Sequence, residues 1–321
     1  MNRWGPIPYT VESNELGLRA TGFARASSTD RLRIVTIGDS VTDGFFVDDN
    51  GTFQHYLQQH LDQGCARRYG VLNAARGGGS IDKELAILRH VVLPLGPHIV
   101  MLVFVTNDIA DLKGIARKNL FGHQLQFHAA NLSRPRRAAL WFVTQTAIGE
   151  GAFRLWWRVA LNRRTAPVAS VNLGDARYQI EGGGAFRRNA QIFGRVFAGT
   201  DGLVLRGRFT SQVRALVENY MNVLETFVVA CRESGVVPVF VYFPSYTQVY
   251  APATPMTIRD VLRENSRRLN MPFLDLTEPL RQNGKTRVLH LAPVDFHPNP
   301  AGNQVIARAL YEFLRAQSLV E

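Results

Sequence analysis

Few folds accommodate the segment from Ile34 to Gly44, which reads Ile-Val-Thr-Ile-Gly-Asp-Ser-Val-Thr-Asp-Gly. Its apolar, β-branched start predicts a buried strand over 32–38, and the Gly-Asp-Ser step predicts a tight turn. Ser40 then lies at the carboxyl end of a strand, where ligands bind in open α/β sheets. An isolated Gly-Asp-Ser is more often a simple helix N-cap, so this segment alone does not establish a catalytic serine.

A second segment, Asp295-Phe296-His297-Pro298-Asn299-Pro300, supplies the partner that such a serine needs. A serine hydroxyl is a weak nucleophile until a base takes its proton and a third group orients that base. We therefore expect Ser40 to act as nucleophile, His297 as base and Asp295 as the orienting acid. A Ser40–His297 dyad with a backbone carbonyl behind the imidazole is the alternative, and His290 is a less favoured rival base.

Strand and helix patterns alternate along most of the chain. Strands are predicted over 32–38, 71–73, 99–105, 236–243 and 272–276, and helices over 52–63, 80–92, 211–233, 257–269 and from 300 onward. This alternation indicates a parallel sheet with helices on both faces. Residues 1–30 are expected to form an irregular arm, and residues 31–321 the domain itself.

Three of the predicted strands end in residues that can donate hydrogen bonds to an oxyanion. Ser40 follows the first strand, Gly78 the second and Asn107 the third. Acyl transfer needs such donors because negative charge develops on the carbonyl oxygen under attack. We expect the backbone N–H groups of Ser40 and Gly78 and the Asn107 amide to form this oxyanion hole.

The long stretch 109–209 interrupts the alternation, and we interpret it as a lid inserted into the domain. Between residues 113 and 164 it holds ten Lys or Arg residues and one acid, so it supplies +9 of the net charge of +11. A solvated surface around a packed lid is the simplest interpretation. An anionic substrate or a membrane surface comes next, since basic amphipathic segments with Trp bind interfaces. Nucleic acid is the least favoured partner because no known binding module accompanies the charge.

The remaining composition restricts the class of protein. Cys65 and Cys231 are too few for a disulfide framework, so free thiols are expected, and no spacing of Cys or His suggests a metal site. No cofactor motif is present, because Arg76–Ser80 lacks the Gly-Lys-Ser/Thr ending of a P-loop. The start of the sequence lacks a signal-peptide pattern and no apolar run reaches bilayer length, which makes a cytoplasmic location the default.

The motifs in this order resemble those of the SGNH (GDSL-type) hydrolase family. Gly38–Gly44 matches the nucleophile block, Asn73–Gly78 the glycine block, Thr106–Asp108 the asparagine block and Asp295–Asn299 the terminal block. The segment Asn14–Arg19 also resembles a leader that precedes the nucleophile block in some bacterial members. The resemblance covers about 32–108 and 211–315 and leaves the insert out.

The resemblance implies a flavodoxin-like three-layer α/β/α sandwich with a five-stranded parallel sheet, ester hydrolysis or acyl transfer, and no cofactor. Two departures limit it: Val105 stands where the family usually has Gly, and Asp295 precedes His297 by two residues rather than three.

We therefore predict a serine esterase that forms an acyl-enzyme on Ser40. The substrates usual for members of this family favour a short acyl group, first of all acetyl, on a small molecule or carbohydrate. An O-acyltransferase that uses the same site, an interfacial lipase and a non-catalytic binding protein of the same fold are the alternatives.

Overall fold

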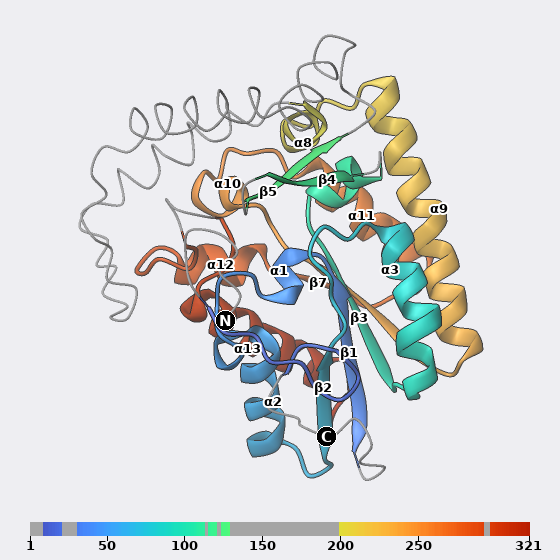
Figure 1. The fold of residues 1–321 in the computed structure, drawn as a ribbon, viewed down its shortest axis with the longest axis vertical. Coiled ribbons are helices and arrows are strands. Elements are labelled where there is room, and N and C mark those ends of the chain that lie inside the picture. The colour runs from blue at the N-terminus through green and yellow to red at the C-terminus, as the bar shows by residue number, and fades with distance from the viewer. Residues whose placement is uncertain (1–8, 21–30, 113–114, 121–122, 129–198, 292–295) are drawn as a thin grey trace. The chain divides into compact units, whose positions relative to one another are not determined.

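Five parallel strands form the central sheet, in the order β2-β1-β3-β6-β7. The computed structural model describes residues 9–20, 31–112, 115–120, 123–128, 199–291 and 296–321 (Figure 1). The strands are β1 (Leu32–Gly38), β2 (Tyr69–Asn73), β3 (Ile99–Phe104), β6 (Val237–Tyr242) and β7 (Phe273–Asp275). Counted along the sheet strands alone, this is the flavodoxin-like order 2-1-3-4-5. The predicted fold class is confirmed.

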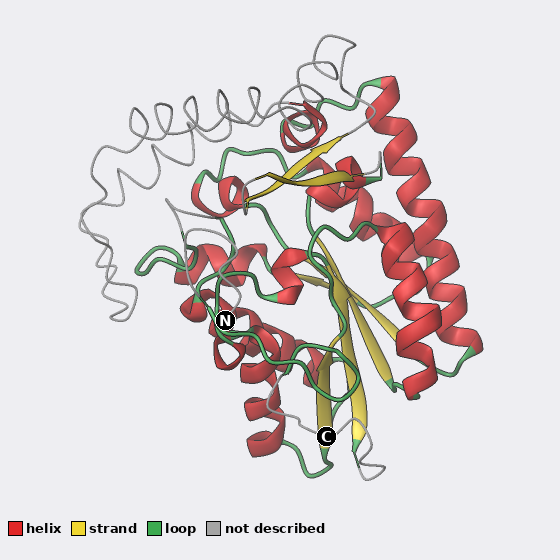
Figure 2. Ribbon diagram, in the orientation of Figure 1, coloured by secondary structure: helices red, strands yellow, loops and turns green. Residues whose placement is uncertain are grey.

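Helices cover both faces of the sheet because its central strands are apolar on both sides. On β1, Val35 and Ile37 enter one core and Ile34 enters the other. The first core is closed by α3 (Ile81–Ile87), α9 (Ser211–Glu233) and α11 (Thr257–Arg268), and the second by α2 (Phe53–Gly64), α12 (Thr277–Asn283) and α13 (Pro300–Ala316). Figure 2 shows α9 and α3 on one side of the strands and α2 on the other.

Local sequence sets where the last helix begins. The Asn299 side chain caps α13 by accepting a hydrogen bond from the N–H of Gly302 at 2.9 Å, and Pro300 occupies the first turn. A Cβ atom at Gly302 would lie 2.1 Å from the carbonyl oxygen of Leu289, so only glycine permits this close approach. The predicted helix start after Asn299-Pro300 is confirmed.

The helix predicted over 80–92 differs from what is observed. Helix α3 ends at Ile87 and continues as a π-helical turn, η2 (Leu88–Val92), and a 3₁₀ turn, η3 (Leu93–Leu95). Pro94 lies in the 3₁₀ turn, two residues after the π-helical turn ends, and proline has no N–H and clashes with the carbonyl four residues before it. The regular helical ladder is therefore replaced by irregular turns before Pro94 is reached.

Besides α12 and the turns η2 and η3, five short helical elements were absent from the predicted pattern. They are α1 (Ser40–Asp43), the 3₁₀ turn η1 (Asp49–Gly51), α4 (Asn107–Asp111), α8 (Gly199–Leu205) and α10 (Tyr246–Tyr250). Four of them, α1, α4, α8 and α10, contribute residues to the cleft described below. None of the described helices combines the length and the apolarity needed to cross a lipid bilayer.

The chain divides into two compact units, one of residues 1–112 with 180–321 and one of residues 113–179. In the second unit the structure describes an antiparallel hairpin of β4 (Ile115–Leu120) and β5 (His123–His128). Trp141, Trp156 and Trp157 lie outside the described residues. The assignment of 109–209 as a lid stays a prediction.

Candidate active site

Ser40 is held in a sharp turn between β1 and α1. Asp39 is the N-cap of α1, and its Oδ1 accepts a hydrogen bond from the N–H of Val41 at 2.9 Å. Gly38 is required here because a Cβ atom would lie 2.3 Å from Thr42 Oγ1. The turn leaves the Ser40 side chain at the carboxyl end of a central strand, in the cleft.

His297 meets Ser40 from the other end of the chain. Its Nε2 lies 2.8 Å from Ser40 Oγ, a hydrogen-bonding distance. The imidazole is placed by the segment before α13, where the N–H of Leu291 donates to the carbonyl of His297 at 2.9 Å. The structure therefore brings together the two residues that the sequence singled out as nucleophile and base.

His290, the rival base, is not among the residues that line the cleft. His290 is fully buried, and its Nδ1 lies 3.2 Å from the hydroxyl of Tyr250, in an aromatic cluster with Tyr246 and Phe243. It belongs to the core. Asp295 lies outside the described residues, so its role as orienting acid stays a prediction.

The glycine loop after β2 packs on the turn that holds Ser40. The N–H of Arg76 donates to the carbonyl of Gly38 at 3.1 Å, and a turn follows in which Gly79 N–H donates to the Arg76 carbonyl. Gly78 adopts φ +70°, the left-handed value that the third position of such a turn requires. Among the described residues, the N–H groups of Ser40 and Gly78 have no hydrogen-bond acceptor, which leaves them available to an oxyanion.

Asn107, the third expected donor, lines the same cleft at the start of α4. Its Nδ2 donates to Asp39 Oδ2 at 3.0 Å and to Asp111 Oδ2 at 3.2 Å. Asp39 Oδ2 also lies 3.4 Å from Ser40 Oγ. An oxyanion formed at Ser40 would therefore compete with these two carboxylates for the Asn107 amide.

A group of acidic residues lies behind the segment Thr106–Asp108, which carries Asn107. Glu84 and Asp108 are fully buried, and Asp108 Oδ2 accepts from the N–H of Val105 at 2.9 Å. Burial raises the pKa of both carboxyls well above the usual range, and their neighbouring carboxylates raise it further. Burial also raises the pKa of Asp111 to about 7. These shifts favour the protonated forms of the buried carboxyls, a feature that the sequence did not indicate.

The cleft beside Ser40 and His297 has a volume of about 260 Å³. Its wall is mostly apolar and comes from strand ends, short helices and the segment before α13: Val41, Val105, Leu205, Phe243, Tyr246 and Phe296. Such a wall suits the hydrocarbon part of an acyl group next to polar groups that perform chemistry.

Two phenylalanines that the sequence analysis did not single out flank the imidazole of His297. The Phe45 ring stacks on it with centroids 5.7 Å apart, and the Phe46 ring meets it edge-on at 5.6 Å. Phe46 adopts φ +65°, which is unusual for a bulky residue. The only available signal was two aromatic residues directly after the nucleophile block.

The described residues contain no group of three or more His, Cys, Asp or Glu side chains that could hold a metal ion. Cys65 and Cys231 are both free thiols, and burial raises the pKa of Cys231 to about 12. A low thiolate fraction argues against a role for Cys231 as a nucleophile.

The model of the GDSL-like lipase/acylhydrolase family matches residues 36–305. Among curated proteins, none matches this sequence. Of the solved structures that are similar, TesA is 13% identical with a TM-score of 0.48, covering 88% of this chain and 98% of its own. The acetyl xylan esterase AlAXEase is 12% identical with a TM-score of 0.47, and the match covers 88% of this chain and 98% of the esterase. The lipase/acylhydrolase from Enterococcus faecalis is 14% identical with a TM-score of 0.47, and the match covers 89% of this chain and 96% of that protein. At these values the similarities say nothing of this chain's substrate.

Proposed function

Because the chain belongs to the GDSL-like lipase/acylhydrolase family, we propose that it is a serine esterase whose nucleophile is Ser40 and whose base is His297. The observation that carries this proposal is the 2.8 Å contact between His297 Nε2 and Ser40 Oγ. A hydrogen bond of this kind lets the imidazole take the hydroxyl proton as the oxygen attacks.

The proposed reaction has two halves. Ser40 Oγ attacks the ester carbonyl while its proton moves to His297 Nε2, and the resulting oxyanion accepts from the N–H groups of Ser40 and Gly78. The intermediate collapses to an acyl-enzyme as His297 gives that proton to the leaving alcohol. Water then attacks the acyl-enzyme while the same imidazole takes its proton. This second intermediate releases the carboxylic acid as that proton passes to Ser40 Oγ, which regenerates the enzyme.

Two supporting roles belong to the same proposal. Asp295 orients the imidazole and stabilises its protonated form. Asn107 supplies the third oxyanion donor once its amide leaves one of the carboxylates that now accept from it. Both roles predict losses of kcat on substitution that exceed the losses of binding.

The acyl group is proposed to be short, with acetyl on a small molecule or carbohydrate as the first candidate. An O-acyltransferase would use the same acyl-enzyme and differ only in the acceptor that replaces water. The apolar side chains on the cleft wall also favour an interfacial lipase with longer acyl chains as a candidate, so the chain-length profile is part of the test.

The proposal is tested with p-nitrophenyl acetate, butyrate and octanoate and with Ser40→Ala and His297→Ala. Each substitution is expected to lower kcat at least about 10³-fold, as removal of either member of such a pair does. Matched controls are Ser234→Ala and His90→Ala, two exposed residues that should leave turnover unchanged. Circular dichroism verifies folding.

A fluorophosphonate that labels serine nucleophiles gives an independent readout by mass spectrometry. Labelling at Ser40 that His297→Ala slows would support the pair. A folded wild-type protein that neither turns over any ester nor labels at Ser40 would rule out the esterase and favour a non-catalytic binding protein.

A further inference from the structure

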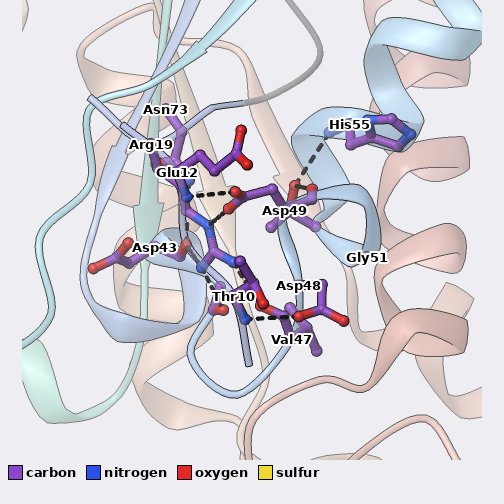
Figure 3. A network of polar contacts seen from close by, with 12 residues as sticks. Thr10, Glu12, Arg19, Asp43, Val47, Asp48, Asp49, Gly51, His55 and Asn73 are labelled. Carbon is purple, nitrogen blue, oxygen red and sulfur yellow. Dashed lines mark hydrogen bonds and ion pairs between the residues drawn. The ribbon is translucent and has the colours of Figure 1, made fainter. Parts of the chain in front are cut away.

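Arg19 is buried against the loop 44–47, which follows α1, and its side chain is only 3% exposed. Its Nε donates to Asp49 Oδ1 at 2.6 Å, and its Nη1 donates to the carbonyls of Asp43 and Gly44 at 2.6 Å each. Its Nη2 donates to the carbonyl of Val47 at 2.5 Å. Figure 3 shows this guanidinium surrounded by the loop, with Asp49 on one side.

The chemistry of these contacts calls for an arginine. Helix α1 ends at Asp43, and the carbonyls at a helix end have no partner within the helix. The guanidinium has five donors in a rigid planar fork, so it satisfies three carbonyls and one carboxylate together. A lysine ammonium has three donors around one point and cannot span these acceptors.

The clamped loop carries the two rings that flank His297. Phe45 and Phe46 lie between Gly44 and Val47, the two residues whose carbonyls accept from Arg19. Phe46 holds its unfavourable φ of +65° in this interval, a conformation that persists only where the surroundings impose it.

The same loop reaches the glycine loop. A Cβ atom at Gly77 would lie 2.2 Å from the tip of the Phe45 ring, so the ring lies directly on Gly77. Gly77 N–H also donates to Asp43 Oδ2 at 3.2 Å. One side of the Phe45 ring thus meets the imidazole and another meets the loop that carries Gly78.

The arm from Tyr9 to Ala20 brings Arg19 to this position. Its backbone N–H groups at Thr10 and Glu12 donate to Asp48 Oδ1 at 2.7 Å and to Asp49 Oδ2 at 2.6 Å. Arg19 itself forms an antiparallel bridge with Asn73 at the end of β2. The arm is therefore fixed both to the residues that follow the loop and to the end of β2.

We infer that Arg19 is a positioning residue for the proposed reaction: it holds the loop 44–47 so that Phe45 and Phe46 fix the plane of the His297 imidazole beside Ser40. This inference rests on the proposed function of that pair. A merely structural clamp would lower stability and leave the turnover of the folded enzyme and the environment of the imidazole unchanged.

The test compares Arg19→Lys with Arg33→Lys. Arg33 also uses its guanidinium on a carbonyl, that of Leu95 at 2.6 Å, but at the opposite end of β1. We expect Arg19→Lys to lower kcat for p-nitrophenyl acetate about 10- to 100-fold with KM changed less than about twofold, because misplaced catalytic groups cost rate more than binding. Arg33→Lys should leave both parameters at the wild-type values.

A second readout needs no turnover. In protein labelled with ¹³C-histidine, the His297 ring C–H signal is identified by its loss in His297→Ala, and the Phe45 and Phe46 ring currents determine its position. Arg19→Lys is expected to move this signal, and Arg33→Lys to leave it in place. A wild type without esterase activity would sink the proposed function and still leave this measurement decisive for Arg19.

Phe45→Leu tests the second step of the inference, from the ring to the imidazole, if Arg19→Lys does not fold. It removes the ring contact while leaving every Arg19 hydrogen bond in place, and we expect a kcat loss similar to that of Arg19→Lys, with KM again changed less than about twofold. Unchanged kcat in either folded variant, or an unmoved His297 signal in folded Arg19→Lys, would overturn the inference.

Discussion

At the scale of single residues, the buried carboxyl of Glu84 has the clearest energetic consequence. It is fully buried, and both of its oxygens lack a hydrogen-bond partner among the described residues. Its pKa is raised well above the usual range, first by burial and then by the charges of Asp39, Asp82 and Asp111. The folded protein therefore binds a proton that the unfolded chain releases at lower pH.

This proton predicts how stability changes with pH. Between the ordinary pKa of a glutamate and the raised value, the folded state holds more protons, so the free energy of unfolding falls as pH rises. One such group contributes a slope of up to about 1.4 kcal/mol per pH unit, and the contribution is fully present only below the ordinary pKa. Asp111, with a pKa of about 7, acts in the same direction.

We expect Glu84→Gln to flatten this slope, because glutamine resembles the protonated acid. Urea denaturation at pH 5 and pH 8 should show the variant gaining stability relative to wild type at the higher pH. The control is Glu218→Gln, an exposed residue of α9 that should give the wild-type slope. Parallel curves for wild type and Glu84→Gln would show that Glu84 is ionised in the folded protein.

At the scale of elements, the cleft is made where strand ends meet short helices. Val105 follows β3, Phe243 follows β6, and Leu205 and Tyr246 come from α8 and α10. The hydrophobic periodicity of the sequence did not predict these helices, because one or two turns are too short to establish a pattern. The apolar wall of the cleft consequently depends on elements that only the structure supplies.

Leu205 offers a test of which acyl chains this wall admits. Leu205→Trp fills the cleft, so we expect the ratio of kcat/KM for octanoate over acetate to fall about tenfold, in line with the 1–3 kcal/mol that one methylene is worth in an apolar pocket. Leu203→Ala, on the same helix and outside the cleft lining, should preserve the ratio. A ratio unaffected by Leu205→Trp would place the acyl chain elsewhere.

At the scale of the whole molecule, the sequence predicted the sheet and the pairing of Ser40 with His297. Each of these residues lies in a local motif, a strand end for one and an Asn-Pro helix start for the other, and parallel topology brings such ends together. The roles of Arg19, Phe45 and Phe46 could not be predicted, because their contacts join segments far apart and leave no local pattern. Asp295 stays a prediction.

The distance along the chain between Ser40 and His297 has a consequence for how activity arises. These two residues are 257 positions apart, and α13, which follows His297, packs on α2 near the start. At synthesis rates of roughly 5–20 residues per second, about 13–50 seconds separate their appearance from the ribosome. The nascent chain therefore contains Ser40 long before its proposed base. Fluorophosphonate labelling in timed cell-free translation should begin only after the last helix has emerged.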